Sequence, residues 1–225
     1  MLDVLVFAPH PDDAELGSGG AIIKAVTMGL KVGIIDFTAG ELGSLGNKKI
    51  RLEEAQTAKE ILGVEFRENL ELPDGNLGFE NQKEITFLVA NKIRQYKPKN
   101  ILAPYWEDRH PDHIACSKIA TQATHYAKLE KVVLKHSKHK IERIIYYELN
   151  GQFNPTFIMD VSDSFEKKKK AIMSFKSQFE SFTKEFLPFP LVERCLYYGS
   201  LINAKYGEAY FMRKPLDLHD WQILI

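Results

Sequence analysis

The sequence predicts an α/β protein with a doubly wound, mostly parallel, Rossmann-like sheet and helices on both faces. Residues 2–8, 31–38 and 100–105 are short runs rich in Val, Ile and Leu, which is typical of parallel strands buried on both sides. Segments with the apolar spacing of helices separate these runs. Such alternation is typical of βαβ units with right-handed crossovers.

The helices expected in the first half each end at glycine or before proline. They are residues 21–28 before Gly29, residues 52–62 before Gly63, and about residues 81–96 before Pro98. With residues 64–70 as the third strand, the run at 100–105 becomes the fourth.

Beyond about residue 130 the pattern is weaker. We expect strands at 143–149 and 156–161 and helices at 164–179 and 191–204. No internal repeat, low-complexity tract or linker interrupts the sequence, so we expect one domain over residues 1–225. The aromatic side chains of Tyr197, Tyr198 and Tyr206 are expected in the core rather than at an interface between subunits.

The composition argues against several classes of protein. With 225 residues and 44% hydrophobic content, the chain can bury a sizeable core. Lys plus Arg and Asp plus Glu number 30 each, so no net field favours nucleic acid or an anionic membrane as partner. No apolar run approaches the roughly 18 residues that span a bilayer, and the first strand has no basic segment before it, which indicates a cytoplasmic protein. Cys116 and Cys195 are too few for a disulfide framework, so a metal site must use His and carboxylate side chains.

Two similar segments follow the first and fourth predicted strands, namely His10-Pro11-Asp12-Asp13 and His110-Pro111-Asp112-His113. Either segment alone is an ordinary turn sequence, because Pro and Asp are common in turns. In a doubly wound sheet, ligands collect at the carboxyl ends of the strands where the strand order reverses, here between the first and fourth strands. The two segments are therefore expected to lie side by side.

The side chains of these segments suit a catalytic zinc ion. Imidazole nitrogen and carboxylate oxygen are zinc ligands, and three protein ligands leave one position open for water. His10, Asp13 and His113 can form that set, for one Zn²⁺ per chain or for another divalent metal ion. Asp12 then remains as a base that takes a proton from the metal-activated water.

His110 and Asp112 complete the predicted site. His110 is placed to stabilise an oxyanion, and His113 lies one helical turn away if a helix starts near Asp112, so both rings can point toward one centre. Asp112 either holds an imidazole in its tautomer or caps the following helix.

The same residues carry a resemblance to a known family. Residues 8–17 and 109–113 resemble the two signature motifs of the PIG-L / LmbE-like zinc N-deacetylases. The resemblance continues through Arg51, Glu54, Ala58 and Leu62-Gly63, and through Leu72-Pro73-Asp74-Gly75. Residues 104–108, 147–151, 177–179 and 206–210 look most like the branch that deacetylates N-acetylglucosaminyl malate in bacillithiol biosynthesis.

This resemblance implies a metal-dependent N-acetylglucosamine-type deacetylase. The family positions that bind zinc match His10, Asp13 and His113, the base matches Asp12, and the oxyanion-side histidine matches His110. The implied partner is a small N-acetylated glycoside, N-acetyl-glucosaminyl L-malate in the most similar branch, and the resemblance also allows a homo-oligomer.

Arg51 resembles the arginine that faces the substrate in this family, where a fixed cation suits a malate carboxylate or the acetate product. The alternative is a surface arginine paired with Glu53 or Glu54. Two departures from the family pattern concern the pocket rim: Ser18 stands where close relatives often have Cys, and residues 182–190 match no pattern.

Three other functions fit parts of the sequence. A non-catalytic metal-dependent sugar-binding module would keep the three ligands but has no need of Asp12 or His110. Gly17-Ser18-Gly19-Gly20 is similar to a phosphate-binding loop, yet the Gly-x-Gly-x-x-Gly order is absent. A two-metal phosphoesterase needs more bridging carboxylates. The sequence therefore favours a hydrolase that attacks an amide carbonyl with metal-activated water.

Overall fold

A computed structural model describes residues 1–43, 46–79, 81–179 and 191–215, and the strands within these ranges form one sheet. The strands are β1 (Val4–Ala8), β2 (Val32–Thr38), β3 (Phe66–Leu72), β4 (Asn100–Pro104), β5 (Arg143–Tyr147), β6 (Phe157–Asp160) and β7 (Gly207–Phe211). Their order is β3-β2-β1-β4-β5-β7-β6, with β1 to β5 parallel and β7 antiparallel to β5 and β6. The doubly wound, mostly parallel fold is confirmed, with its reversal of strand order between β1 and β4.

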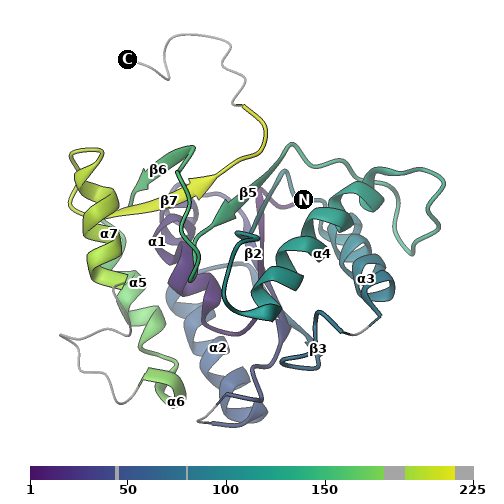
Figure 1. Ribbon diagram of the computed structural model, residues 1–225, viewed down its shortest axis with the longest axis horizontal. Helices are drawn as coiled ribbons and strands as arrows, with labels where there is room; N and C mark the ends of the chain where they lie inside the picture. The colour runs from purple at the N-terminus through teal and green to yellow at the C-terminus, as the bar shows by residue number, and fades with distance from the viewer. Residues whose placement is uncertain (44–45, 80, 180–190, 216–225) are drawn as a thin grey trace.

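Helices cover both faces of this sheet. They are α1 (Asp13–Thr27), α2 (Lys48–Leu62), α3 (Gln82–Tyr96), α4 (Pro111–Lys128), α5 (Phe165–Ile172), α6 (Lys176–Phe179) and α7 (Leu191–Ser200). Helices α3 and α4 pack together on one face, and α1, α2 and α5 pack together on the other (Figure 1). Among the described helices, none combines the length and the apolar composition that crossing a bilayer requires.

Side chains along β1 alternate between two cores. Leu5 and Phe7 pack into the core shared with α3 and α4, whereas Val6 and Ala8 pack into the core shared with α1. All four are fully buried, as is usual for a strand covered on both faces. The segment that follows β1 is consequently anchored from both sides.

Several boundaries differ from the sequence-based expectation. Helix α1 begins at Asp13 and takes in Gly17 to Gly20, so the phosphate-loop alternative is wrong. Strand β3 begins two residues later than expected, and the helix expected over 164–179 is divided into α5 and α6. Strand β7 has no counterpart among the predicted elements. The end of α2 is as expected, because Gly63 adopts the left-handed conformation with φ 82°.

The tyrosine cluster is only partly in the core. Tyr198 is buried, and Tyr206 stacks on Phe165 with ring centroids 3.7 Å apart. Tyr197 is 60% exposed, so the prediction of a core position is wrong for this residue. Residues 182–190, which match no family pattern, lie outside the described residues.

Glu208 of β7 holds α1 in place. Its carboxylate accepts hydrogen bonds from the backbone N–H groups of Gly20 and Ala21 at 2.8 and 2.9 Å and from Lys168 Nζ at 2.6 Å. Lys168 also donates to the carbonyl of Leu16 at 3.0 Å. A Cβ at Gly20 would lie 2.9 Å from Glu208 Oε1, so glycine is what permits this approach.

Gly17 of α1 faces the ring of Tyr147, and a methyl group has no room there. A Cβ would lie 2.2 Å from Tyr147 Cδ2, and the ring is fixed because its hydroxyl donates to the carbonyl of Phe7 at 2.8 Å. We expect Gly17→Ala to lower the free energy of unfolding by about 1–3 kcal/mol through overpacking, although alanine in an open helix would raise it by about 1 kcal/mol.

Urea denaturation followed by circular dichroism measures this change. Gly78→Ala is the matched control, because a Cβ at Gly78 meets no atom within 4 Å. Equal or greater stability of the Gly17→Ala protein would contradict the close contact with Tyr147.

Candidate metal centre and active site

The pairing of β1 with β4 brings the two His-Pro-Asp segments together. The two strands run parallel in register from Val4 opposite Asn100, so their carboxyl ends meet at the same edge of the sheet. The rings of His10 and His110 lie with their centroids 4.9 Å apart. The expectation that the segments are neighbours is confirmed.

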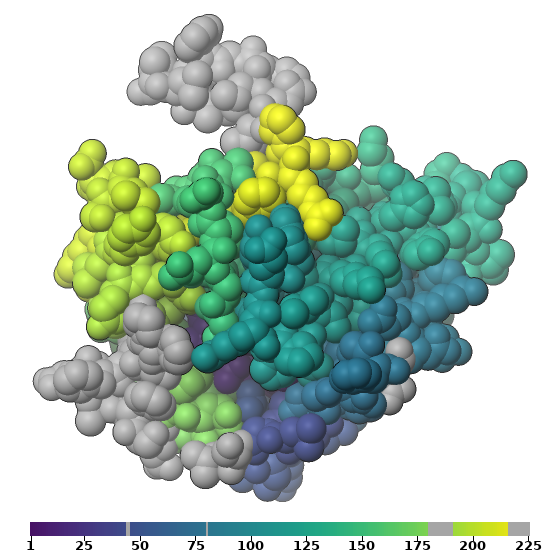
Figure 2. All heavy atoms as spheres, viewed as in Figure 1, coloured from purple at the N-terminus to yellow at the C-terminus, as the bar shows by residue number. Residues whose placement is uncertain are grey.

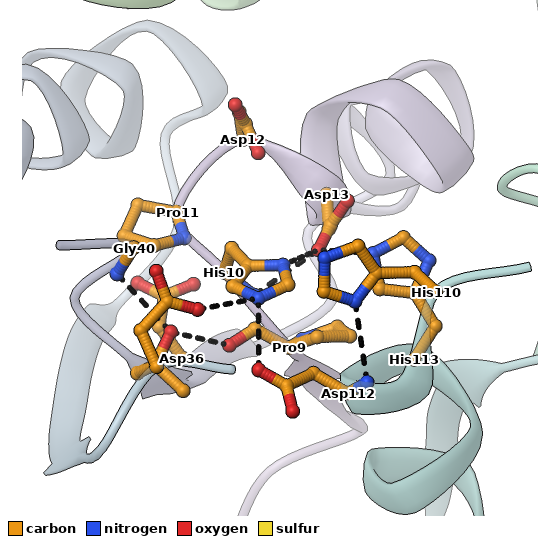
Figure 3. Close-up of polar contacts among 12 residues, drawn as sticks. Pro9, His10, Pro11, Asp12, Asp13, Asp36, Gly40, His110, Asp112 and His113 are labelled. Atoms are coloured by element: carbon orange, nitrogen blue, oxygen red, sulfur yellow. Dashed lines mark hydrogen bonds and ion pairs between the residues drawn. The ribbon is translucent and has the colours of Figure 1, made fainter. Parts of the chain in front are cut away.

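Three side chains at this edge converge on one point. Asp13 Oδ2 lies 3.0 Å from His10 Nδ1 and 3.4 Å from His113 Nε2, and the three ligand atoms all lie within 4.8 Å of one another. All three residues are at most 9% exposed. Figure 3 shows His10, Asp13 and His113 turned toward one another.

Carboxylates on the far side of each ring fix the tautomers of these histidines. His10 Nε2 lies 3.1 Å from Asp74 Oδ1 and 3.3 Å from Asp112 Oδ2, and His113 Nδ1 lies 3.1 Å from Asp108 Oδ2. Because ionised carboxylates only accept hydrogen bonds, the far nitrogens carry the N–H groups.

The near nitrogens of His10 and His113 face the anionic oxygen of Asp13. Burial opposes protonation of both histidines, but the surrounding carboxylates outweigh it and raise the pKa of each ring. When the near nitrogens release their protons, all three atoms become electron-pair donors. Three electron-pair donors that face one another are stabilised by a cation between them. Two imidazoles and one carboxylate suit zinc and related divalent ions. The described residues therefore fit the metal ion that the sequence predicts.

Asp12 points away from this convergence, as Figure 3 shows. Its backbone has φ 112° and ψ −28°, a conformation that residues other than glycine rarely adopt. Burial raises the pKa of Asp12 to about 7, against the opposing effect of the Arg51 guanidinium. The adjacent aspartates thus have different surroundings: Asp13 lies between His10 and His113, and Asp12 lies beside the guanidinium of Arg51.

Arg51 lies against the first segment and is only 4% exposed. Its Nη2 donates to the carbonyl of Pro11 at 2.6 Å and to Asp12 Oδ2 at 3.3 Å. Gly40, with φ 66°, leaves room for the guanidinium, since a Cβ there would lie 2.7 Å from Arg51 Cζ. Glu54 instead accepts hydrogen bonds from Ser177, so the alternative of a surface arginine paired with Glu53 or Glu54 is wrong.

His110 is the N-cap of α4. Its Nδ1 accepts a hydrogen bond from the backbone N–H of Asp112 at 3.2 Å, so the proton of the neutral ring is on Nε2. Burial and the nearby His113 lower the pKa of His110, which favours that neutral form. The cap is therefore His110, and the alternative that Asp112 caps this helix is wrong; Asp112 lies within α4 and faces His10.

Several site residues were not identified from the sequence. Asp74 and Asp108 have roles set by their contacts with His10 and His113, although Asp74 lies in a segment that resembles the family and Asp108 stands two residues before His110. Beneath the site, Arg67 Nη1 donates to Glu15 Oε1 at 2.5 Å and Arg67 Nε to Asp36 Oδ2 at 2.6 Å, and all three side chains are buried. Paired polar residues of this kind leave no periodic pattern in a sequence.

Comparisons with known proteins identify similar sequences and a similar fold. Residues 5–124 match the model of the family described as PIG-L, GlcNAc-PI de-N-acetylase. The chain is 29% identical to a diacetylchitobiose deacetylase of Thermococcus kodakarensis, over 96% of this chain and 85% of the relative. It is 26% identical to a probable N-acetyl-alpha-D-glucosaminyl L-malate deacetylase 2 of Bacillus cereus, over 81% and 86%. A crystal structure of a conserved protein from Thermus thermophilus matches with a TM-score of 0.90 and 36% identity, over 99% of both chains.

Asp108 is expected to tune metal affinity without being a ligand. Asp108→Asn weakens the acceptor that orients His113, so we expect zinc affinity to fall about 10–100-fold, whereas His113→Ala should leave purified protein without retained metal. Titration of the metal-free protein with zinc in competition with a chromophoric chelator measures both effects.

Asp3→Asn is the control, because Asp3 pairs with Lys99 at the opposite end of β1 and its loss changes the net charge equally. An Asp108→Asn protein that binds zinc as tightly as the Asp3→Asn protein would remove Asp108 from the metal centre.

Proposed function

The chain belongs to the PIG-L family and is a hydrolase that acts on N-acetyl amides, and from this premise we propose that it removes the acetyl group from an N-acetylated amino sugar, releasing acetate and a free amine. The observation that carries the proposal is the convergence of His10 Nδ1, Asp13 Oδ2 and His113 Nε2 within 4.8 Å, beside a buried carboxylate that is not part of that set. A sugar-binding module would have no use for the separate carboxylate of Asp12.

His10, Asp13 and His113 would hold one Zn²⁺ or another divalent ion. When bound, such an ion lowers the pKa of water and polarises a carbonyl group. Asp112, Asp74 and Asp108 keep the two histidines in the tautomers that ligation requires, which supports the assignment of the ligand set.

Asp12 acts as the base that accepts the proton of the attacking water. A base with a pKa near the working pH combines adequate ionisation with adequate proton affinity. Arg51 orients this carboxylate through Nη2 and opposes the effect of burial on its pKa. Because Arg51 lies beside Asp12, an anionic group of the substrate or the acetate product would meet its guanidinium there.

His110 donates from Nε2 to the carbonyl oxygen as negative charge develops on it. The backbone N–H of Asp112 occupies Nδ1 and so fixes the tautomer that this task needs. A donor fixed before the reaction costs no reorganisation as the charge appears.

For the substrate, we propose an N-acetylglucosamine unit that carries a second group. The two relatives described above are named for diacetylchitobiose and for N-acetyl-glucosaminyl L-malate, and both contain this unit. The likeness of residues 104–108, 147–151, 177–179 and 206–210 to the malate branch supports the malate glycoside of bacillithiol biosynthesis, whereas the higher identity over more of the chain supports diacetylchitobiose.

Acetate release from N-acetylglucosaminyl malate, N,N'-diacetylchitobiose and N-acetylglucosamine tests the proposal. We expect acetate from at least one substrate, loss of activity with a chelator, and recovery on adding zinc. Asp12→Asn should retain metal but lose about 100–10,000-fold in kcat, because the general base is gone.

Elemental analysis of the same Asp12→Asn preparation supplies the metal content. Near-normal acetate release by this variant would refute the base assignment. A metal-loaded wild-type protein that binds these sugars and releases no acetate would refute the proposed reaction.

The two roles of His110 can be separated by substitution. His110→Ser keeps an oxygen that can cap α4 but lacks a donor that reaches the substrate, so we expect kcat to fall about 100–1,000-fold with thermal stability near that of the wild type. His110→Ala should lose the rate equally and also about 1 kcal/mol of stability. Steady-state kinetics and thermal unfolding measure the two effects, and a serine variant with full activity would leave His110 with a capping role alone.

A further inference from the structure

A cavity of about 570 Å³ lies between the second half of α4, strand β5 and the residues that follow β7. This volume is within the range of sites that hold small molecules. Residues 121–128, 140–146 and 212–215 supply its three walls. Figure 2 shows the yellow segment at the end of the described chain beside the teal and green segments that supply the other two walls.

The cavity is separate from the metal centre, although α4 contributes to both. His113 lies in the first turn of α4, whereas the cavity is lined by the second half of this helix, as far as Lys128. At a rise of about 1.5 Å per residue, Lys128 lies roughly 22 Å from His113 along the helix axis. An N-acetyl group bound at the metal centre therefore leaves this cavity open to another ligand.

Positive charge dominates the lining. Five cations line the cavity against one carboxylate, in a chain that has 30 groups of each sign. The carboxylate of Glu142 pairs with Arg143, with Oε2 3.3 Å from Nη1. Among the described residues, Lys128, Lys140 and Lys214 have no carboxylate within ion-pair distance. Exposed ammonium groups so placed attract an anion that carries several charges.

Arg213, the fifth cation, is held in place by aromatic rings. Its guanidinium lies over the ring of Trp106 at 4.1 Å from the centroid and at 5.7 Å from the centroid of Tyr146. Stacking of this kind uses the face of the guanidinium and leaves the N–H groups at its edge to donate, in a planar arrangement that matches two phosphate oxygens. Glu107, next to Trp106 in sequence, does not line the cavity, and no carboxylate of the described chain forms an ion pair with Arg213.

The lining also has an apolar part. Ile141 and Met212 contribute to it together with Tyr146, whose hydroxyl lies 2.8 Å from Thr121 Oγ1. A small inorganic ion would leave this surface in contact with water, whereas an organic anion would cover it. The exposed imidazole of His125 offers an aromatic face to a planar base. The ligand that matches both parts has several phosphate charges and an aromatic body.

We propose that this cavity binds a nucleoside di- or triphosphate, with the phosphates against Lys140, Arg213 and Lys214 and the nucleoside against Ile141 and Met212. The proposed deacetylation needs no such ligand, so this is a second binding function of the chain. Its occupation requires neither the metal ion nor the metal ligands.

Isothermal titration calorimetry with ATP, adenosine and inorganic tripolyphosphate, in buffer without divalent metal ions, tests the proposal. We expect ATP to bind more tightly than either fragment and more weakly as salt is added. Lys140→Ala combined with Lys214→Ala should raise the Kd for ATP about tenfold. Lys167→Ala combined with Lys170→Ala is the matched control, because it removes two exposed cations of α5 on the other face of the sheet. This control and His113→Ala should bind ATP like the wild type.

Failure of the wild-type protein to bind ATP, or an equal loss of affinity in the α5 control, would overturn the site. Weaker binding by His113→Ala would place the anion at the metal centre instead. Tripolyphosphate that binds as tightly as ATP would refute the nucleoside part of the proposal, and a single-stranded oligonucleotide that binds more tightly than ATP would identify a nucleic-acid surface in its place. Acetate release by the Lys140→Ala, Lys214→Ala protein should equal that of the wild type, so the proposed reaction and this site are tested separately.

Discussion

One buried carboxylate connects the parts of the chain that form the site. Asp112 is fully buried, and it accepts hydrogen bonds from the backbone N–H groups of Gly75 and Leu77 while facing His10 Nε2. Three segments, after β1, after β3 and at the start of α4, therefore meet at a single side chain. An ionised carboxylate without partners is very unfavourable in the interior. The arrangement is therefore cooperative, because the loop after β3 and His10 each provide polar partners for this carboxylate of α4.

The two adjacent aspartates owe their different surroundings to backbone strain. A residue with the conformation of Asp12 costs of the order of 1–3 kcal/mol, and the hydrogen bonds of Arg51 to Pro11 and Asp12 offset part of that cost. A relaxed turn would send the two carboxylates in other directions. The strain thus separates the proposed proton acceptor, Asp12, from the proposed metal ligand, Asp13. The buried pairing of Arg67 with Glu15 and Asp36 helps to hold the start of α1 in this position.

The sequence was sufficient to predict the strands of the first half, the reversal of strand order between β1 and β4, and the side chains that converge there. Apolar runs and two similar His-Pro-Asp segments indicate these features directly. It was insufficient where contacts with residues distant in sequence determine the local structure or the role of a side chain. The glycines of α1 are typical of a loop in the sequence, and only the structure shows that Tyr147 and Glu208 pack where larger side chains would stand. Asp74 and Asp108 look like turn residues until the histidines stand beside them. Strand β7 is short, and pairing with β5 and β6 defines it more than its own residues do.

The hydrogen bonds of Glu208 and Lys168 to the backbone of α1 have a thermodynamic consequence. The proposed metal ligands lie between residues 10 and 113, yet α1, which begins with one of them, is held by the side chain of Glu208. Thermodynamic linkage is reciprocal. If the pairing of β7 with its neighbouring strands increases metal affinity, a bound ion stabilises that pairing by the same free energy. An ion held by His10, Asp13 and His113 would therefore stabilise the pairing of β7 with β5 and β6, although no residue of β7 would touch it.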